Sequence, residues 1–287
     1  MISDITLGQF FPGTSLIHKL DPRTKILIAT AFIVAVFLAN NFAAFLFLTL
    51  ITAALVLISG ISLRTILKSL KPIIIILIFT ALINIFLTSG EGDPLVSFWV
   101  IKIYTEGIVR AVFMALRVIL LIIGTSVLLT YTTSPISLTD GIESLLKPLK
   151  LIKVPVHVFA MMMTIALRFI PTLVEETEKI MNAQKSRGAD FTSGSIIKRA
   201  KALVPILIPL FVSSFKRAEE LATAMECRCY RGDVNRTKFV KLTFSLRDYV
   251  MLFVSLICLL ALIASRIIPY HFEFSNAIYN IIFYRFR

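Results

Sequence analysis

Charged residues are scarce in this sequence. They make up only 16% of its 287 residues, whereas 57% are hydrophobic. Soluble globular proteins carry about 25% charged and about 45–50% apolar residues. The mean hydropathy of +0.87 points the same way. This composition excludes a disordered chain and a soluble nucleic-acid-binding protein, and it predicts a polytopic membrane protein of the all-α class.

Cysteine and histidine are also rare, with three of each. Three cysteines cannot form a disulfide framework, so a disulfide-stapled secreted scaffold is excluded. Cys227 and Cys229 lie close together in a basic region, but no histidine or second cysteine pair is nearby. A zinc ion requires four ligands. We therefore expect reduced thiols on the cytoplasmic side and no metal site in this chain.

Two kinds of catalytic pattern are missing from the sequence. It contains no glycine-rich loop followed by Lys-Ser/Thr, the motif that cradles nucleotide phosphates. It also contains no cluster of His, Asp and Glu that would suggest an enzyme active site. We therefore expect a non-enzymatic chain, and energy for transport would come from a partner or from an ion gradient.

Long apolar runs dominate instead. A spanning helix needs about 20 predominantly apolar residues. Residues 25–58 are too long for one such helix and are broken only by Asn40 and Asn41, which predicts two helices joined by a tight turn. Three further spans are predicted over 73–87, 108–129 and 249–263, which gives about five in all.

The charges of the loops predict the orientation. Residues 59–71 carry three basic residues and no acidic one, whereas 88–106 carry three acidic residues and one lysine. Positively charged loops stay on the cytoplasmic side, so we expect residues 59–71 inside and residues 88–106 outside. Two predicted spans precede 59–71, and the N-terminus is therefore expected on the cytoplasmic side as well. The sequence then predicts an N-terminal transmembrane domain over 1–130, a cytoplasmic coupling domain over 131–246, and a C-terminal span and tail over 247–287. The side on which that tail lies stays open.

Prolines and scattered charge interrupt the apolar stretches 154–167 and 203–212. We interpret these stretches as amphipathic helices at the membrane surface, with short extra spans as the alternative. Helical periodicity predicts one helix that begins near Pro171 and ends before Gly188, and a second that ends near Tyr230. Pro205 and Pro209 are expected to bend the approach to the second helix.

The two helices end alike. A shift of 41 residues places Ala183 on Ala224 and Arg187 on Arg228. Small residues flank both arginines: Ser186 and Gly188 in the first motif, Cys227 and Cys229 in the second. Two interpretations fit equally well. Each arginine could complement its helix dipole, or it could enter a partner's groove and pair with a carboxylate there.

Cys229 is where the two motifs differ most, because it replaces the glycine of the first. A cysteine has less freedom than glycine at positive φ. We therefore expect the turn after Arg228 to differ from the turn after Arg187.

Arg117 lies well inside the predicted span 108–129. An ionisable residue at such a depth is a candidate functional residue. The spans hold almost no acidic residues, so a proton relay is disfavoured. We predict that Arg117 pairs with a carbonyl or an acid inside the bundle.

Four stretches of the chain resemble the transmembrane T component of energy-coupling factor transporters, which are ABC-type importers. They are Phe11–Lys25, Leu167–Leu173, Ala183–Gly188 and Ala224–Tyr230. The last two are similar to the paired Ala-Arg-Gly-type signatures of that family. Ser186 and Cys227 stand where the family usually has alanine, and Cys229 stands where it has glycine, but all three residues remain small.

The resemblance implies a non-catalytic scaffold in a bacterial cell membrane. Each signature arginine would enter a groove on one of two ATPase subunits, which would bind the ATP and magnesium. The implied docking residues are Arg187, Arg228, Ala183, Ser186, Gly188, Ala224, Cys227 and Cys229. The apolar face of the coupling helices would contact a small membrane-embedded S component that captures a vitamin or a transition metal. The expected S-facing residues are Leu173, Thr177, Ile180, Met181, Phe215 and Leu221.

A secondary transporter driven by an ion gradient is the alternative. Such proteins have broken helices at mid-membrane and a repeated transmembrane architecture. The only internal repeat found here lies in the segment expected to be cytoplasmic. The scaffold is therefore favoured, while the transported substrate is not disclosed by the sequence.

Overall fold

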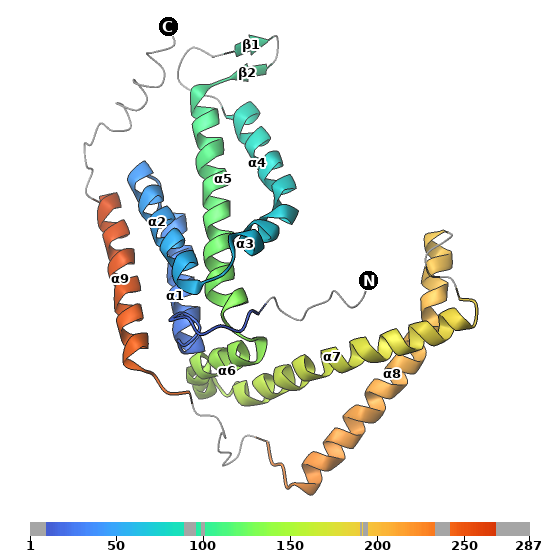
Figure 1. The fold of residues 1–287 in the computed structure, drawn as a ribbon. Coiled ribbons are helices and arrows are strands. Elements are labelled where there is room, and N and C mark those ends of the chain that lie inside the picture. Colours follow the sequence, from blue (N-terminus) through green and yellow to red (C-terminus); the bar gives the residue numbers. More distant parts are fainter. Residues whose placement is uncertain are drawn as a thin grey trace. The chain divides into compact units, whose positions relative to one another are not determined.

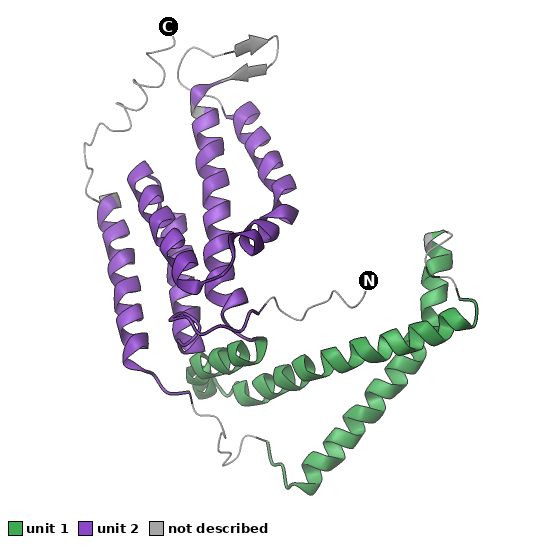
Figure 2. Ribbon diagram, viewed as in Figure 1, with its two compact units in different colours: residues 1–9, 135–241 green, residues 10–134, 242–287 purple. Residues whose placement is uncertain are grey.

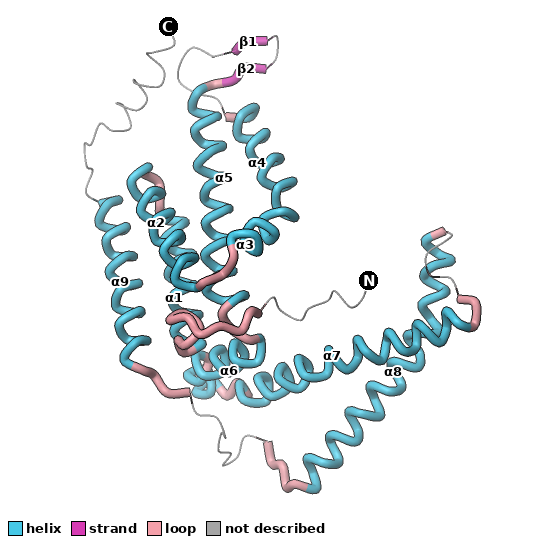
Figure 3. Tube along the Cα trace, viewed as in Figure 1, coloured by secondary structure: helices cyan, strands magenta, loops and turns pink. Residues whose placement is uncertain are grey.

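The computed structural model describes residues 10–88, 96–98, 101–189, 191, 195–232 and 242–267. The chain forms two compact units (Figure 2). One comprises 10–134 and 242–287, and the other contains 135–241 together with 1–9. In the described part, the regular secondary structure is helical apart from one antiparallel hairpin, Val96–Phe98 (β1) with Ile101–Ile103 (β2), and loops join the elements (Figure 3).

The first unit is a helical bundle (Figure 1). Its long helices are α1 (Pro22–Leu38), α2 (Phe42–Ser59), α4 (Ile74–Leu87), α5 (Thr105–Thr125) and α9 (Leu246–Ile267). The short helix α3 (Leu63–Leu70) and a 3-10 turn (η1, Lys71–Ile73) lead into α4, and a π-helical segment (η2, Ser126–Tyr131) extends α5. The predicted turn at Asn40–Asn41 is confirmed, because α1 ends at Leu38 and Asn41 is the N-cap of α2.

The core of this bundle lies around α1, which packs against both α5 and α9. Phe32 and Val36 of α1 are buried with Phe45 of α2 and Leu120 of α5. Gly124 of α5 lies directly against the Phe32 ring, where a Cβ atom would clash. A glycine is therefore needed for the close approach of α5 to α1.

Five helical segments are long and apolar enough to span a membrane. They are Phe42–Ser59, Leu63–Leu87, Gly107–Tyr131, Val156–Ser186 and Leu246–Ser265. An all-α multi-pass protein with five candidate spans is thus confirmed, but the set differs from the predicted one. Val156–Ser186, which we expected at the membrane surface, is among them, while α1, with 17 residues, is not.

Arg117 of α5 pairs with a backbone carbonyl, as predicted. Its Nη2 donates to the carbonyl oxygen of Ala39 at 2.6 Å, and its guanidinium lies 5.5 Å from the centre of the Phe45 ring. Ala39 is the C-cap of α1. Carbonyls at a helix C-terminus lack intrahelical partners and carry partial negative charge. Arg117 therefore fixes the turn between α1 and α2 from within the bundle.

The second unit consists of α6 (Pro135–Leu145), a 3-10 segment (η3, Lys147–Ile152), α7 (Val156–Ser186) and α8 (Ile196–Cys227). α6 packs against α7, and Glu143 Oε1 lies 3.0 Å from His157 Nδ1. The functional division into transmembrane and coupling domains stays a prediction.

The expected start of the first coupling helix near Pro171 is wrong. α7 begins at Val156 and continues through Pro171. An interior proline removes one backbone hydrogen bond and strains the helix. Apolar residues on both sides of Pro171 extend the helix regardless, as happens in apolar helices whose neighbours compensate for the lost bond.

Pro205 and Pro209 both lie inside α8, which is continuous from Ile196 to Cys227. Its N-terminus is capped by Ser195, whose side chain accepts from the backbone N–H of Lys198. Figure 1 shows the axis of α8 change direction in its first half, where the prolines lie. Proline is a common cause of sharp helix kinks, so the predicted bend is confirmed.

Candidate functional site: two helices that end in the same arginine turn

Helices α7 and α8 pack against each other through a polar contact. Arg217 Nη2 donates to Glu176 Oε2 at 2.6 Å, and Ser213 Oγ donates to Glu176 Oε1 at 2.5 Å. Both carboxylate oxygens of Glu176 are satisfied by α8, so this pair fixes the point where the helices meet.

The contact joins equivalent positions of the internal repeat, since Glu176 and Arg217 are 41 residues apart. Each motif arginine follows its contact residue by eleven positions. With a rise of 1.5 Å per residue, the two arginines lie about 16 Å along their helices from the contact. The two helices therefore extend by equal lengths from their contact to their motifs.

The two helix ends have the same backbone geometry. Arg187 is the C-cap of α7 with φ −88° and ψ 8°, and Arg228 is the C-cap of α8 with φ −90° and ψ 15°. The next residue has positive φ in both turns: 86° at Gly188 and 56° at Cys229. The structure thus confirms that the sequence repeat corresponds to a repeat of local structure.

The hydrogen bonds of the two turns correspond as well. Gly188 N donates to Lys185 O at 2.9 Å, and Ala189 N to Gln184 O at 3.0 Å. Cys229 N donates to Glu226 O at 2.9 Å, and Tyr230 N to Met225 O at 3.0 Å. This is the Schellman pattern, in which backbone N–H groups satisfy the last carbonyls of a helix. Neither arginine is needed to satisfy those carbonyls, which leaves the dipole term of about 0.3–1 kcal/mol as the only capping role.

The expectation that Cys229 would change the second turn is wrong. Cys229 adopts the left-handed conformation, although this costs an L-residue other than glycine about 1–2 kcal/mol. The two paired backbone bonds of the turn offset that cost. The conformation is set by the helix end, and the residue type only modulates its stability.

A substitution at Cys229 tests this account of the turn. We expect Cys229→Gly to stabilise the end of α8 by up to about 1 kcal/mol, because glycine adopts positive φ without a steric penalty. Cys229→Val should destabilise it, since a β-branched residue is strongly disfavoured there. Hydrogen exchange at the amides of residues 225–230 measures the effect. Cys227→Ala, inside the helix, is the control and should leave the exchange unchanged.

All eight predicted docking residues are exposed in the two motifs. They are Ala183, Ser186, Arg187, Gly188, Ala224, Cys227, Arg228 and Cys229. Exposed arginines between small neighbours at two helix ends form protruding, sterically open cations. Among the described residues, no group of three or more His, Cys, Asp or Glu side chains could hold a metal ion.

The residues predicted to face an S component fall into two groups. Leu173, Thr177, Ile180, Met181 and Leu221 are half-buried, whereas Phe215 is 62% exposed. Phe211, which lies one turn earlier in α8, is 64% exposed, and its ring centre is 4.6 Å from that of Phe215. Phe211 was not among the predicted S-facing residues, although helical periodicity places it on the same stripe of α8 as Phe215, four residues earlier.

Comparison with known proteins agrees with this architecture. A family model described as cobalt transport protein matches residues 13–239. The energy-coupling factor transporter transmembrane protein EcfT of Clostridium kluyveri is 55% identical over 267 residues, which cover 93% of this chain and 98% of that protein. The protein of the same name in Bacillus subtilis is 51% identical over 263 residues, covering 92% and 98%. These names denote transmembrane components of a transporter, and the chain belongs to the energy-coupling factor transporter transmembrane protein family.

Proposed function

We propose that this chain couples ATP hydrolysis by two ABC-type ATPase subunits to a small membrane-embedded S component that captures the substrate. The observation that carries the proposal is the pair of superimposable arginine turns at the ends of α7 and α8. A repeated docking element on two helices suits two copies, or two homologues, of one kind of partner.

Each motif presents a guanidinium, which is suited to bidentate pairing with a carboxylate. The small flanking residues let the helix end approach a partner groove closely. In each Schellman turn, backbone N–H groups donate to the last helix carbonyls, so the guanidinium is not needed as their donor. Arg187 and Arg228 would thus each anchor one ATPase subunit, with Ala183, Ser186, Gly188, Ala224, Cys227 and Cys229 as close-packing neighbours.

The Glu176–Arg217 contact supports the transmission step. Two helices that are fixed to each other at one point, and that extend equally to their motifs, change their mutual angle when the motifs are moved together or apart. ATP-driven closure of the two ATPase subunits would impose such a movement. The same helices carry the exposed aromatic pair Phe211 and Phe215, which would pass the movement to the S component.

In this proposal the S component selects the substrate, which is a vitamin or a transition metal. ATP and magnesium would bind to the partner ATPases, since the sequence of this chain carries no phosphate-binding loop. The motifs would lie on the cytoplasmic side, together with the N-terminus.

Co-purification tests the proposal. Tagged full-length chain, extracted gently from its native membranes, should bring with it two ABC-type ATPase subunits and a small membrane protein, identified by mass spectrometry. The identity of the small protein would name the substrate. A chain that comes out alone, and that moves a solute without ATP, would contradict the proposal and favour an ion-driven transporter.

A further inference from the structure

The segment that carries α7 and α8 is joined to the helical bundle at two points, Ser134–Pro135 and Lys241–Leu242, which we call the two crossings. On the side of the helical bundle, η2 precedes the first crossing and α9 follows the second. Residues 11–25, which are far from both in sequence, make hydrogen bonds to each of these two places. All the contacts described below lie within the bundle unit.

The first crossing is held by Phe11 and Lys25. Phe11 N donates to Tyr131 O at 3.0 Å, and the two rings lie 5.8 Å apart. Lys25 Nζ donates to Thr132 O at 2.7 Å. Lys25 and Thr132 are each only 2% exposed. A buried ammonium is costly unless it is hydrogen-bonded, so the position of Thr132 is closely specified.

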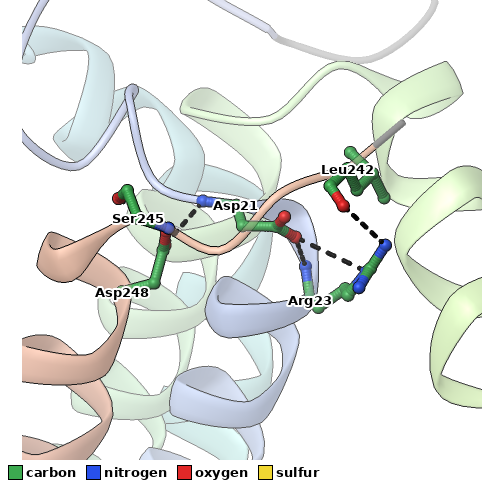
Figure 4. Close-up of polar contacts among 5 residues, drawn as sticks. All are labelled: Asp21, Arg23, Leu242, Ser245 and Asp248. Atoms are coloured by element: carbon green, nitrogen blue, oxygen red, sulfur yellow. Dashed lines mark hydrogen bonds and ion pairs between the residues drawn. The ribbon is translucent and has the colours of Figure 1, made fainter. Parts of the chain in front are cut away.

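The second crossing is held by Asp21 and Arg23 (Figure 4). Asp248 is 1% exposed, and its Oδ1 accepts from Asp21 N at 2.8 Å. Its Oδ2 accepts from both the backbone N and the hydroxyl of Ser245, each at 2.8 Å. Arg23 Nη2 donates to Leu242 O at 3.4 Å, and its guanidinium lies 5.2 Å from the centre of the Phe244 ring.

The segment that makes these contacts is itself tied together. Ser15 Oγ and His18 Nδ1 lie 2.6 Å apart, and His18 Nε2 lies 3.0 Å from Phe11 O. Gly13 lies against the His18 ring, where a Cβ would be only 2.7 Å from Cε1. Asp21 Oδ1 accepts from Arg23 N at 2.9 Å and so caps α1. Contacts within residues 11–25 therefore hold this segment in one conformation.

We propose that residues 11–25 form a clasp that holds the two chain crossings in a fixed relation, with Lys25 and Asp248 as its positioning residues. This rests on the proposed function, because the crossings are the covalent routes by which movement of the helices α7 and α8 enters the bundle. A fixed relation makes both crossings move as one. Without the clasp, movement of α7 and α8 would separate η2 from the start of α9 instead of moving both together.

Two features favour this role over simple capping of α1. Helix capping needs only the Asp21 side chain, whereas Lys25 reaches Thr132, Arg23 reaches Leu242, and Asp248 accepts from Asp21 N. Buried polar networks of this kind can specify one arrangement of the chain more than they add stability. Hydrogen bonds at a sequence separation of 227 residues cannot serve local helix formation.

Spin labels placed at the two crossings test the clasp. Thr130 and Leu246 are exposed, and cysteines placed there would report their distance once Cys227, Cys229 and Cys258 are changed to serine. In the full-length chain in lipid nanodiscs, pulsed electron paramagnetic resonance should give one narrow distance distribution. We expect Asp248→Asn to roughly double its width, because the lost acceptor frees the start of α9. Arg23→Gln, a milder change at a side chain that is 17% exposed, should broaden it less, and remains informative if Asp248→Asn fails to fold.

Arg117→Gln is the matched control, since it removes another hydrogen-bonded charge from the same unit and should leave the distribution narrow. The clasp is refuted if Asp248→Asn and Arg23→Gln fold and keep the narrow distribution, or if Arg117→Gln broadens it equally. In the assembled complex, the clasp variants should keep ATPase subunits bound and hydrolysing ATP. Because the label experiment needs no partner, its outcome is independent of the docking proposal, which co-purification tests.

Discussion

Reversal of both motif arginines, Arg187→Glu with Arg228→Glu, should release the ATPase subunits from the chain. Each substitution places a carboxylate where the partner groove is expected to offer one. Loss of a hydrogen-bonded charge pair at an interface costs about 2–5 kcal/mol, and like charges add repulsion. We therefore expect the affinity for the ATPase subunits to fall at least about a hundredfold. The measurement is the amount of ATPase that co-purifies with the tagged variant.

The chain itself should stay folded in this variant, because both arginines are exposed and backbone bonds complete both turns. Arg231→Glu is the matched control, since Arg231 is exposed three residues beyond Arg228 and lies outside the small-flanked motif. It should retain the ATPase subunits. If the double variant binds the ATPase subunits as well as the wild type does, the arginines do not dock the ATPases and only complement the helix dipoles.

Reversal of the contact between the two helices should have the second-largest effect. In Glu176→Lys, a cation would face Arg217, and the hydrogen bond from Ser213 would be lost as well. The ion pair is partly exposed, with side chains 37% and 22% accessible, so its direct contribution to stability is about 1 kcal/mol or less. The repulsion between like charges, by contrast, is expected to separate the helices. With Cys229 and Cys258 changed to serine, spin labels at Cys227 and at Ser186→Cys should then show a broader distance distribution than in the same background with Glu176 intact.

A charge swap distinguishes a specific contact from general damage. Glu176→Arg combined with Arg217→Glu restores opposite charges at the same two positions, and it should recover the narrow distribution and the coupled ATPase activity. Glu178→Lys is the control, because Glu178 is two residues away, and among the described residues the hydrogen bonds and the ion pair between α7 and α8 are made by Glu176. If the swap is no better than the single reversals, the helices are not held at this point.

Much of the bundle could be predicted from the sequence because its signals are local. Asn40 and Asn41 interrupt a long apolar run, so the turn between α1 and α2 was evident. Pairing of Arg117 with a carbonyl or an acid inside the bundle was also predicted, since a cation in an apolar span has few alternatives, and the structure shows the carbonyl of Ala39. Among the site residues, the repeated pattern around Arg187 and Arg228 predicted two similar helix ends, and the hydrogen bonds of both turns show the similarity.

Other features could not be predicted because they depend on tertiary contacts. Pro171 is a strong local signal for a helix start, yet α7 extends 15 residues upstream of it to Val156. Cys229 adopts positive φ because the Schellman bonds require it. The contact between Glu176 and Arg217 depends on how two helices pack, although the 41-residue repeat already placed the two at equivalent positions. Asp248 lies 227 residues from Asp21, and no sequence pattern indicates their contact.

We propose that this chain is the scaffold that carries two ATPase subunits, and the mass of the intact assembly tests this proposal most directly. Native mass spectrometry of the complex purified from its own membranes should give one copy of this chain, of 32.2 kDa, with two ATPase subunits and one small membrane protein. If each single variant, Arg187→Glu or Arg228→Glu, loses one of the two ATPase subunits, then one subunit is assigned to each helix end. A wild-type chain that is recovered intact without any ATPase, under conditions that preserve other membrane complexes, would contradict the account.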